Sequence, residues 1–204
     1  MTEKRVYLAS RSPRRRELLR QIGVSFELLL VREDARRGRD VNEAVLDGET
    51  AADYAMRIAR AKAEVAARQA LQRGLRPYPT LGADTSIVLD GAIVGKPDNA
   101  QHATEILRAL SGREHEVMTA VAIGLRDRVE TALSISTVEF RELSDDEIYG
   151  YVRFGEPYGK AGAYAIQGRA AIFVRRIAGS YSGIMGLPLA ETAELLRRFD
   201  IEVV

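Results

Sequence analysis

The segment TLGADTSIVLDGAIVGKP at 80–97 constrains the fold more than any other part of the sequence. Two apolar, β-branched runs flank Asp90-Gly91, the pair that favours a tight two-residue turn, so the segment predicts a β-hairpin. Strands interspersed with helices, with a hairpin among them, predict an α/β fold with a mixed, twisted sheet and flanking helices. The other candidate strands lie at 5–9, 25–31, 115–125, 130–143 and 171–177.

Capping residues and apolar spacing predict the helices. Each candidate helix combines an N-terminal Ser, Asp or Pro with apolar residues three or four positions apart, and two of the starts have a capping-box pattern. The expected helices run from Ser12 to Gly23, from Asp53 to Leu71, from the cap Asp98 to Leu110, from the cap Ser144 onward, and from Pro188 to Phe199.

Composition excludes several classes of protein. The 204 residues are 46% hydrophobic and 29% charged, which suits a single globular domain over 1–204. Thirty basic and 29 acidic residues leave a net charge of +1, which argues against a nucleic-acid partner. The absence of cysteine excludes disulfides. No run reaches membrane-spanning length and the start lacks a secretory pattern, so we expect no membrane partner and a cytoplasmic location.

The first predicted strand leads through two serines, Ser10 and Ser12, into a helix whose first turn holds Arg14, Arg15 and Arg16. A helix N-terminus repels cations but binds anions, and guanidinium groups match phosphate geometry. We therefore expect Arg14 and Arg15 to bind phosphate at this turn and Arg16 to be exposed, since three successive helical residues cannot face one ligand. A solvated basic turn is the alternative.

Three further polar residues stand out in apolar surroundings. Lys62 borders the apolar stripe of its helix, where it could be a functional lysine or one that extends to solvent. Asp84 interrupts the start of the hairpin strand, and Thr85 falls opposite Lys96 when residues are counted back from the turn. Asp84 could activate water or hold a divalent ion while Lys96 binds phosphate; a surface ion pair is the alternative.

The stretch EPYGKAGAYAIQG at 156–168 is rich in glycine, which suits a loop where backbone approaches a ligand. Its Gln167 can both donate and accept, as reading a base edge requires, and its Lys160 could contact phosphate. An ordinary turn would have a similar composition. The two histidines, His102 and His115, lack ligand spacing and are expected to be structural or exposed.

These segments together resemble the Maf family of nucleoside triphosphate pyrophosphatases, known also as septum-formation-inhibitor-like proteins. The matching segments are LASRSPRRRELL, RIARAKA, GADTSIVLDGAIVGKP, LSGREHEVMTAVAI, EPYGKAGAYAIQG and GSYSGIMGLPL, and they follow the family's order along nearly the whole chain. The resemblance implies a two-lobed α/β fold around a cleft, similar to the inosine triphosphatase fold. It also implies a homodimer and hydrolysis of a nucleoside triphosphate to the monophosphate and pyrophosphate.

The resemblance also implies roles for individual residues. Asp84 would accept a proton from water, and Ser10, Arg14, Arg15, Lys62 and Lys96 would contact phosphate. Arg15, Thr85 and Gln167 match the dTTP/UTP subgroup, rather than the subgroup that acts on 7-methyl-GTP.

A divalent cation, magnesium or manganese, would complete the site, with Asp84 and either Glu33 or Asp34 as ligands. Gly159 and Ala165 stand where the family usually has Asp and Gly. The alternative function is a nucleotide-sensing regulator of septum formation with little turnover.

Overall fold

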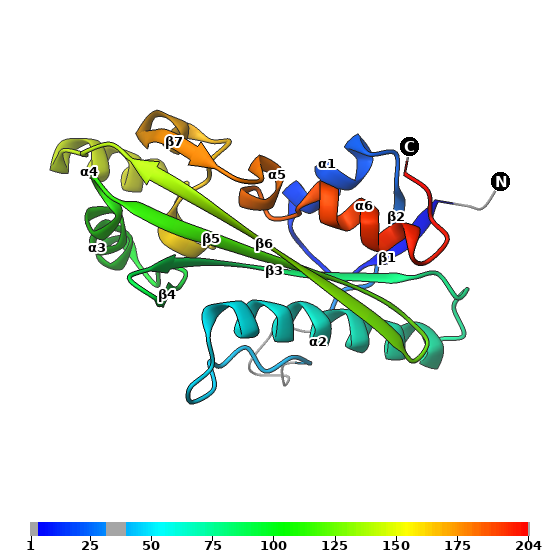
Figure 1. The fold of residues 1–204 in the computed structure, drawn as a ribbon. Helices are drawn as coiled ribbons and strands as arrows, with labels where there is room; N and C mark the ends of the chain where they lie inside the picture. The colour runs from blue at the N-terminus through cyan, green and yellow to red at the C-terminus, as the bar shows by residue number, and fades with distance from the viewer. Residues whose placement is uncertain (1–3, 32–39, 204) are drawn as a thin grey trace.

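The computed structural model describes residues 4–31 and 40–203 as a long twisted sheet with helices on both faces (Figure 1). The strands follow the order β2-β1-β3-β5-β6-β7, and β4 pairs with β3 beside this path. The strands are β1 (Arg5–Leu8), β2 (Ser25–Leu28), β3 (Thr80–Leu89), β4 (Ala92–Val94), β5 (Glu114–Leu125), β6 (Arg128–Phe140) and β7 (Val174–Ala178). The α-helices are α1 (Pro13–Gln21), α2 (Ala51–Gln72), α3 (Ala100–Leu110), α4 (Asp145–Phe154), α5 (Tyr181–Ile184) and α6 (Leu189–Arg197).

The predicted mixed sheet is confirmed. Strand β1 runs parallel to β2 and β3, whereas β3, β4, β5, β6 and β7 pair antiparallel. The predicted hairpin is present between β3 and β4, where Asp90 and Gly91 have φ angles of 51° and 79°. Both turn residues are therefore in the left-handed region that a two-residue hairpin requires.

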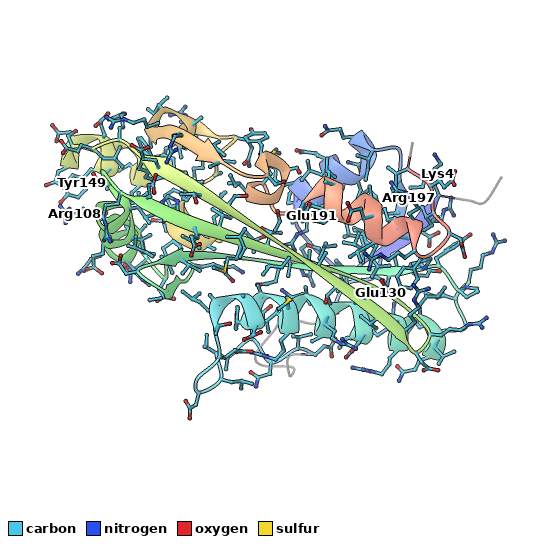
Figure 2. The ribbon with its side chains drawn as sticks, viewed as in Figure 1. Lys4, Arg108, Glu130, Tyr149, Glu191 and Arg197 are labelled. Carbon is cyan, nitrogen blue, oxygen red and sulfur yellow. The ribbon has the colours of Figure 1, made fainter. Side chains whose placement is uncertain are left out.

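Helices cover the two faces of the sheet unequally. The long helix α2 packs on β3, β5 and β6 from one face, while α1, α5 and α6 lie on the other (Figure 1). Helices α3 and α4 pack together at the end of the sheet, where the labelled Arg108 donates to the Tyr149 hydroxyl (Figure 2). No helix in residues 4–31 and 40–203 is long and apolar enough to cross a membrane.

The two largest apolar cores among the described residues lie at opposite ends of the sheet. One gathers α3, α4 and the segment 163–173, around Leu107, Phe140 and Phe173. The other gathers α1 and α6 against β1 and β3, around Leu8 and Leu195. The long strand β5 contributes side chains to both cores, so the sheet is continuous between them.

Small residues bring α2 unusually close to the sheet. A Cβ placed on Gly82 would lie 2.4 Å from the Ala59 carbonyl oxygen and 2.6 Å from the Ala63 nitrogen, so only glycine fits there. Buried alanines of α2 also pack on Ala120 and Ala122 of β5. This close approach brings the middle of α2 within side-chain reach of the start of β3.

Three sequence-based boundaries were wrong. Helix α3 is capped by Asn99, whose side chain accepts from the His102 N–H, and not by Asp98. Helix α2 begins at the cap Thr50, before the predicted start. The segment predicted as a strand from residue 171 begins instead as a 3-10 helix, η3 (Arg169–Phe173), whose Ala170 and Phe173 are buried in the core. Core contacts there outweighed the local strand preference.

Candidate active site

An unpaired stretch of β3 marks the centre of the site. Strand β5 covers one edge of β3 from Thr80 to Val88. On the other edge β1 pairs only with Thr80 and Leu81, and β4 pairs only from Ile87 onward. Between β1 and β4, the described part of the chain puts no strand beside β3. A side chain from either face of β3 can therefore reach the same opening.

A pocket of about 580 Å³ occupies this opening. Its wall comes from the loop before α1, the start of α1, Glu43, the middle of α2, β3, the segment after β4, and the segments at 158–161, 164–167 and 184–186. The predicted site residues that lie in the described part of the chain all line it: Ser10, Arg14, Arg15, Lys62, Asp84, Thr85, Lys96, Lys160 and Gln167.

The start of α1 is built as the sequence predicted. Ser12 is the N-cap and accepts the Arg15 N–H, with Pro13 in the first helical position. The Ser10 hydroxyl oxygen accepts from the Ser12 N–H at 3.2 Å and from Arg15 Nη1 at 3.0 Å. A helix N-terminus with a buried serine and a guanidinium beside it is a favourable anion site.

The three arginines of α1 have different environments. Arg14 lines the pocket and pairs with Glu17 at 2.8 Å, while nearly half of its side chain stays exposed. Arg16 is half-buried and not exposed as predicted, because it turns back to the carbonyl oxygens of Arg11 and Ser12; it is not among the residues that line the pocket. Arg14 can therefore move to a bound anion, whereas Arg16 supports the loop before the helix.

Arg15 connects three segments of the pocket wall. Its Nε donates to the Gly186 carbonyl oxygen at 2.7 Å, its Nη1 to Ser10, and its Nη2 to the Thr85 hydroxyl at 3.3 Å. Thr119 of β5 lies behind Thr85 at 3.1 Å and donates to the Gly183 carbonyl oxygen at 2.8 Å. Arg15 and Thr85 are therefore held in fixed positions before any ligand binds.

Asp84 and Thr85 extend from opposite faces of β3, as strand pleating predicts. Thr85 contacts Arg15 on the α1 side, and Asp84 contacts Lys62 on the α2 side. Both line the one pocket because the edge of β3 is open between them. Lys96 lies two residues beyond the end of β4, where the pairing with β3 has stopped, and it lines the same pocket.

Lys62 pairs with two carboxylates. Its Nζ lies 2.9 Å from Asp84 Oδ1 and 2.8 Å from Glu43 Oε1. The Lys62 side chain is only 10% exposed, so it does not extend to solvent as the alternative interpretation allowed. A buried ammonium is costly unless it is paired, and here two acids pair with it. This cluster of one cation and two acids faces the cationic wall formed by α1 and Lys96.

Sequence reasoning missed Glu43, which lies in a polar stretch without periodicity. Helix α2 fixes it: Arg57 Nη1 donates to the Asn42 carbonyl oxygen at 3.0 Å, and Arg57 Nη2 donates to that of Ala44 at 2.9 Å. The Tyr54 hydroxyl donates to the Glu43 carbonyl oxygen at 3.1 Å. Burial, followed by the charges of Asp84 and Glu43, raises the pKa of Tyr54 to about 12.

Asp84 and Glu43 have the donor chemistry that a magnesium or manganese ion requires. Magnesium in nucleotide enzymes is held by one or two carboxylates together with substrate phosphates and water. Two carboxylates gathered around one ammonium mark a place where positive charge is stabilised. The other predicted ligands, Glu33 and Asp34, lie outside the described residues. Within the described residues, no three acids or histidines form a metal-binding group, so substrate oxygens would complete the shell.

The glycine-rich loop lies across the pocket from α1. Gly159 and Gly162 have φ angles of 75° and 67°, and the Gly162 N–H donates to the Gly95 carbonyl oxygen beside Lys96. Lys160 donates to the Glu156 carbonyl oxygen. Gln167 is half-buried and lines the same pocket as Arg15 and Thr85.

His115 is buried in the core behind this loop, as expected of a structural histidine. Its Nε2 lies 2.8 Å from the Tyr164 hydroxyl, and its Nδ1 has no hydrogen-bond partner in the described part of the chain. Burial lowers the pKa of His115 to about 4. Its imidazole is therefore neutral near pH 7 and supports Tyr164, which lines the pocket.

The fold and the pocket define an α/β protein with a strongly cationic pocket that opens at a gap in a mixed sheet and holds two acids. The family model described as Maf-like protein matches residues 5–199, and the chain therefore belongs to the Maf family.

Curated relatives match the chain over nearly all of its length. A protein of Nitrosospira multiformis named dTTP/UTP pyrophosphatase is 53% identical over 98% of this chain and 97% of its own. Proteins with the same name from Aromatoleum aromaticum and Ralstonia nicotianae are each 56% identical over 96% of this chain, and over 95% and 94% of their own. A solved structure, that of the Staphylococcus aureus Ham1 protein, has a TM-score of 0.48 and 15% identity, over 96% of this chain and 97% of that one.

Proposed function

We propose that the protein is a nucleoside triphosphate pyrophosphatase that hydrolyses dTTP and UTP to the nucleoside monophosphate and pyrophosphate. The observation that carries this proposal is that the Lys62-paired acids Asp84 and Glu43 line the same pocket as Ser10 and Arg14. Curated relatives more than half identical to the chain have the corresponding name, which supports the same activity here.

The polar groups divide into those that bind phosphate and those that move a proton. Ser10, Arg14, Lys96 and Lys160 bind the triphosphate and offset the negative charge that develops as the α–β bond breaks. Asp84 accepts a proton from the attacking water. Lys62 has a different role, because its ammonium lies 2.9 Å from Asp84 Oδ1 and holds that carboxylate in place.

Asp84 and Glu43 would hold the divalent cation, magnesium or manganese. When bound, the ion supplies charge neutralisation at the phosphate oxygens. The proposal includes the base as well: the Gln167 amide pairs with the imide edge of thymine or uracil, and Thr85 and Arg15 form the facing wall.

The test is a panel of nucleoside triphosphates, each with magnesium or manganese, followed by pyrophosphate release. We expect turnover of dTTP and UTP that is lost in Asp84→Asn. Nucleotide binding without turnover on any member would favour the septum-regulator alternative. Preferred turnover of 7-methyl-GTP would contradict the assignment of Gln167 and Thr85 as residues that recognise a pyrimidine. The panel also includes modified pyrimidine nucleotides, which the proposed site could accept.

The same proposal includes a cytoplasmic homodimer without nucleic-acid or membrane partners. The near-neutral net charge of +1 supports the absence of a nucleic-acid partner. Light scattering coupled to gel filtration tests the dimer, and a single-chain mass of about 22.5 kDa would contradict it.

A further inference from the structure

The Glu156 carboxylate holds the end of the glycine-rich loop at the residues that follow Gln167. Its Oε2 accepts from the Arg169 N–H at 3.2 Å, and its Oε1 accepts from the Ala170 N–H at 3.4 Å. The Tyr151 hydroxyl donates to Oε1 at 2.9 Å. Burial, and then this hydrogen bond, raise the pKa of Tyr151, so its hydroxyl remains a donor at neutral pH.

The same residue also fixes the beginning of the loop. Its carbonyl oxygen accepts from Lys160, which lines the pocket. One residue outside the pocket thus ties down two points of the loop, one on each side of Gln167. Glu156 itself is not among the pocket-lining residues.

Glu156 serves as a remote cap for the short helix η3. The N-cap position of η3 is Gly168, which has no side chain to satisfy the first N–H groups. A carboxylate at a helix N-terminus is favourable because it accepts these N–H groups and meets the positive end of the dipole. A Cβ on Gly168 would lie 2.3–2.5 Å from the Glu156 carboxyl atoms, so the glycine is needed for the carboxylate to reach the cap.

We infer that Glu156 is a positioning residue for base selection: its carboxylate fixes the backbone beside Gln167, so that the amide meets the base in a single orientation. This inference rests on the proposed function, in which Gln167 reads the base. An amide can pair with thymine or, after half a turn, with cytosine, since it carries both a donor and an acceptor. Only a fixed amide discriminates between these two bases, and a loose loop would accept both.

The test measures kcat and KM for dTTP and dCTP in Glu156→Gln. The substitution keeps the shape of the side chain but replaces one carboxylate oxygen, an acceptor, by an NH₂ group, a donor that would face the N–H of Arg169 or Ala170. We expect KM for dTTP to rise about tenfold with kcat within about twofold, and the dTTP-to-dCTP ratio of kcat/KM to fall about tenfold. Glu105→Gln is the matched control, because Glu105 is an exposed acid on α3 that accepts only from Gln101 among the described hydrogen bonds.

A merely structural role gives a different result. It would lower the melting temperature and kcat, through a smaller active fraction, and would leave KM and the base ratio unchanged. That outcome, or an unchanged enzyme, overturns the inference. Gln167→Ala is measured in parallel: if it alters the base ratio while Glu156→Gln does not, the inference fails and the proposed function stands. If Gln167→Ala leaves the ratio unchanged, base reading by Gln167 itself fails.

A double-mutant cycle tests the contact directly. Gly168 has a φ of −99°, so an alanine there adds no left-handed strain and acts through its collision with Glu156. We expect Gly168→Ala alone to raise KM for dTTP and to have little further effect in a Glu156→Ala background. Additive effects of the two substitutions would show that the loop is not positioned through this contact.

Discussion

Arg15→Lys is the substitution that most sharply tests how the pocket is assembled. The guanidinium donates to Gly186, Ser10 and Thr85, which belong to three separate segments. A lysine ammonium keeps the charge, but its donors all lie on one nitrogen, so we expect it to replace only one of the three bonds that separate guanidinium nitrogens make. The substitution therefore separates the fork geometry of Arg15 from its charge.

The magnitude follows from the two hydrogen bonds that lysine cannot replace. A hydrogen bond from a charged donor contributes about 1.5 kcal/mol at the lower end of its range, so the two losses come to about 3 kcal/mol. If all of it falls on the transition state, kcat/KM drops about 150-fold. If about 1 kcal/mol falls on folding instead, kcat/KM drops about 30-fold and the melting temperature falls by about 3 °C.

The assay is pyrophosphate release from dTTP, with a thermal melt of each variant. Arg16→Lys is the matched control, since Arg16 donates to the carbonyl oxygens of Arg11 and Ser12 and does not itself line the pocket. We expect Arg16→Lys to stay within about twofold of the original kcat/KM. If the kcat/KM of Arg15→Lys also stays within about threefold of the original value, the charge alone is sufficient. That result would refute the argument that the guanidinium geometry is required.

Three further predictions concern the same walls of the pocket. Arg14→Ala should lower kcat/KM at least about tenfold, whereas Arg16→Ala should change it less than about twofold; equal losses would contradict their division. Gly82→Ala should destabilise the fold by about 3 kcal/mol, because the new methyl group meets the α2 backbone; an unchanged denaturant midpoint would contradict that contact. His115 binds fewer protons when folded, since burial lowers its pKa to about 4 from 6.5, so stability should rise by about 3 kcal/mol as the pH increases from 4 to 6.5. Urea unfolding across this range should lose that rise in His115→Gln, and a rise that persists would assign it to other groups.

Local chemistry in the sequence was enough to predict much of the fold. The Asp90-Gly91 hairpin and the capping box that joins Ser144 and Glu147 depend on residues within a few positions of one another, and both are present. The N-cap of α1 at Ser12 is present for the same reason. Features of this kind are determined by backbone geometry near the residue and do not need the rest of the chain.

The features that the sequence did not reveal depend on contacts between distant segments. Glu43 reaches the pocket because Arg57 and Tyr54, more than ten residues later, hold the backbone around it. Strand pleating accounts for Asp84 and Thr85 lying on opposite faces of β3. The open edge that lets both line one pocket follows from where β1 and β4 stop pairing, which the sequence does not reveal. Helical periodicity alone allowed Lys62 to point either to solvent or to the site. The close approach of α2 to β3 buries it against Asp84, which the sequence could not show.

The most direct test of the central claim is the product balance of dTTP hydrolysis. If the pocket cleaves between the α and β phosphates, each dTMP formed is accompanied by one pyrophosphate, and Asp84→Asn abolishes both products together. Release of inorganic phosphate with dTDP, or product formation that persists in Asp84→Asn, would contradict the assignment of this pocket as a pyrophosphatase site.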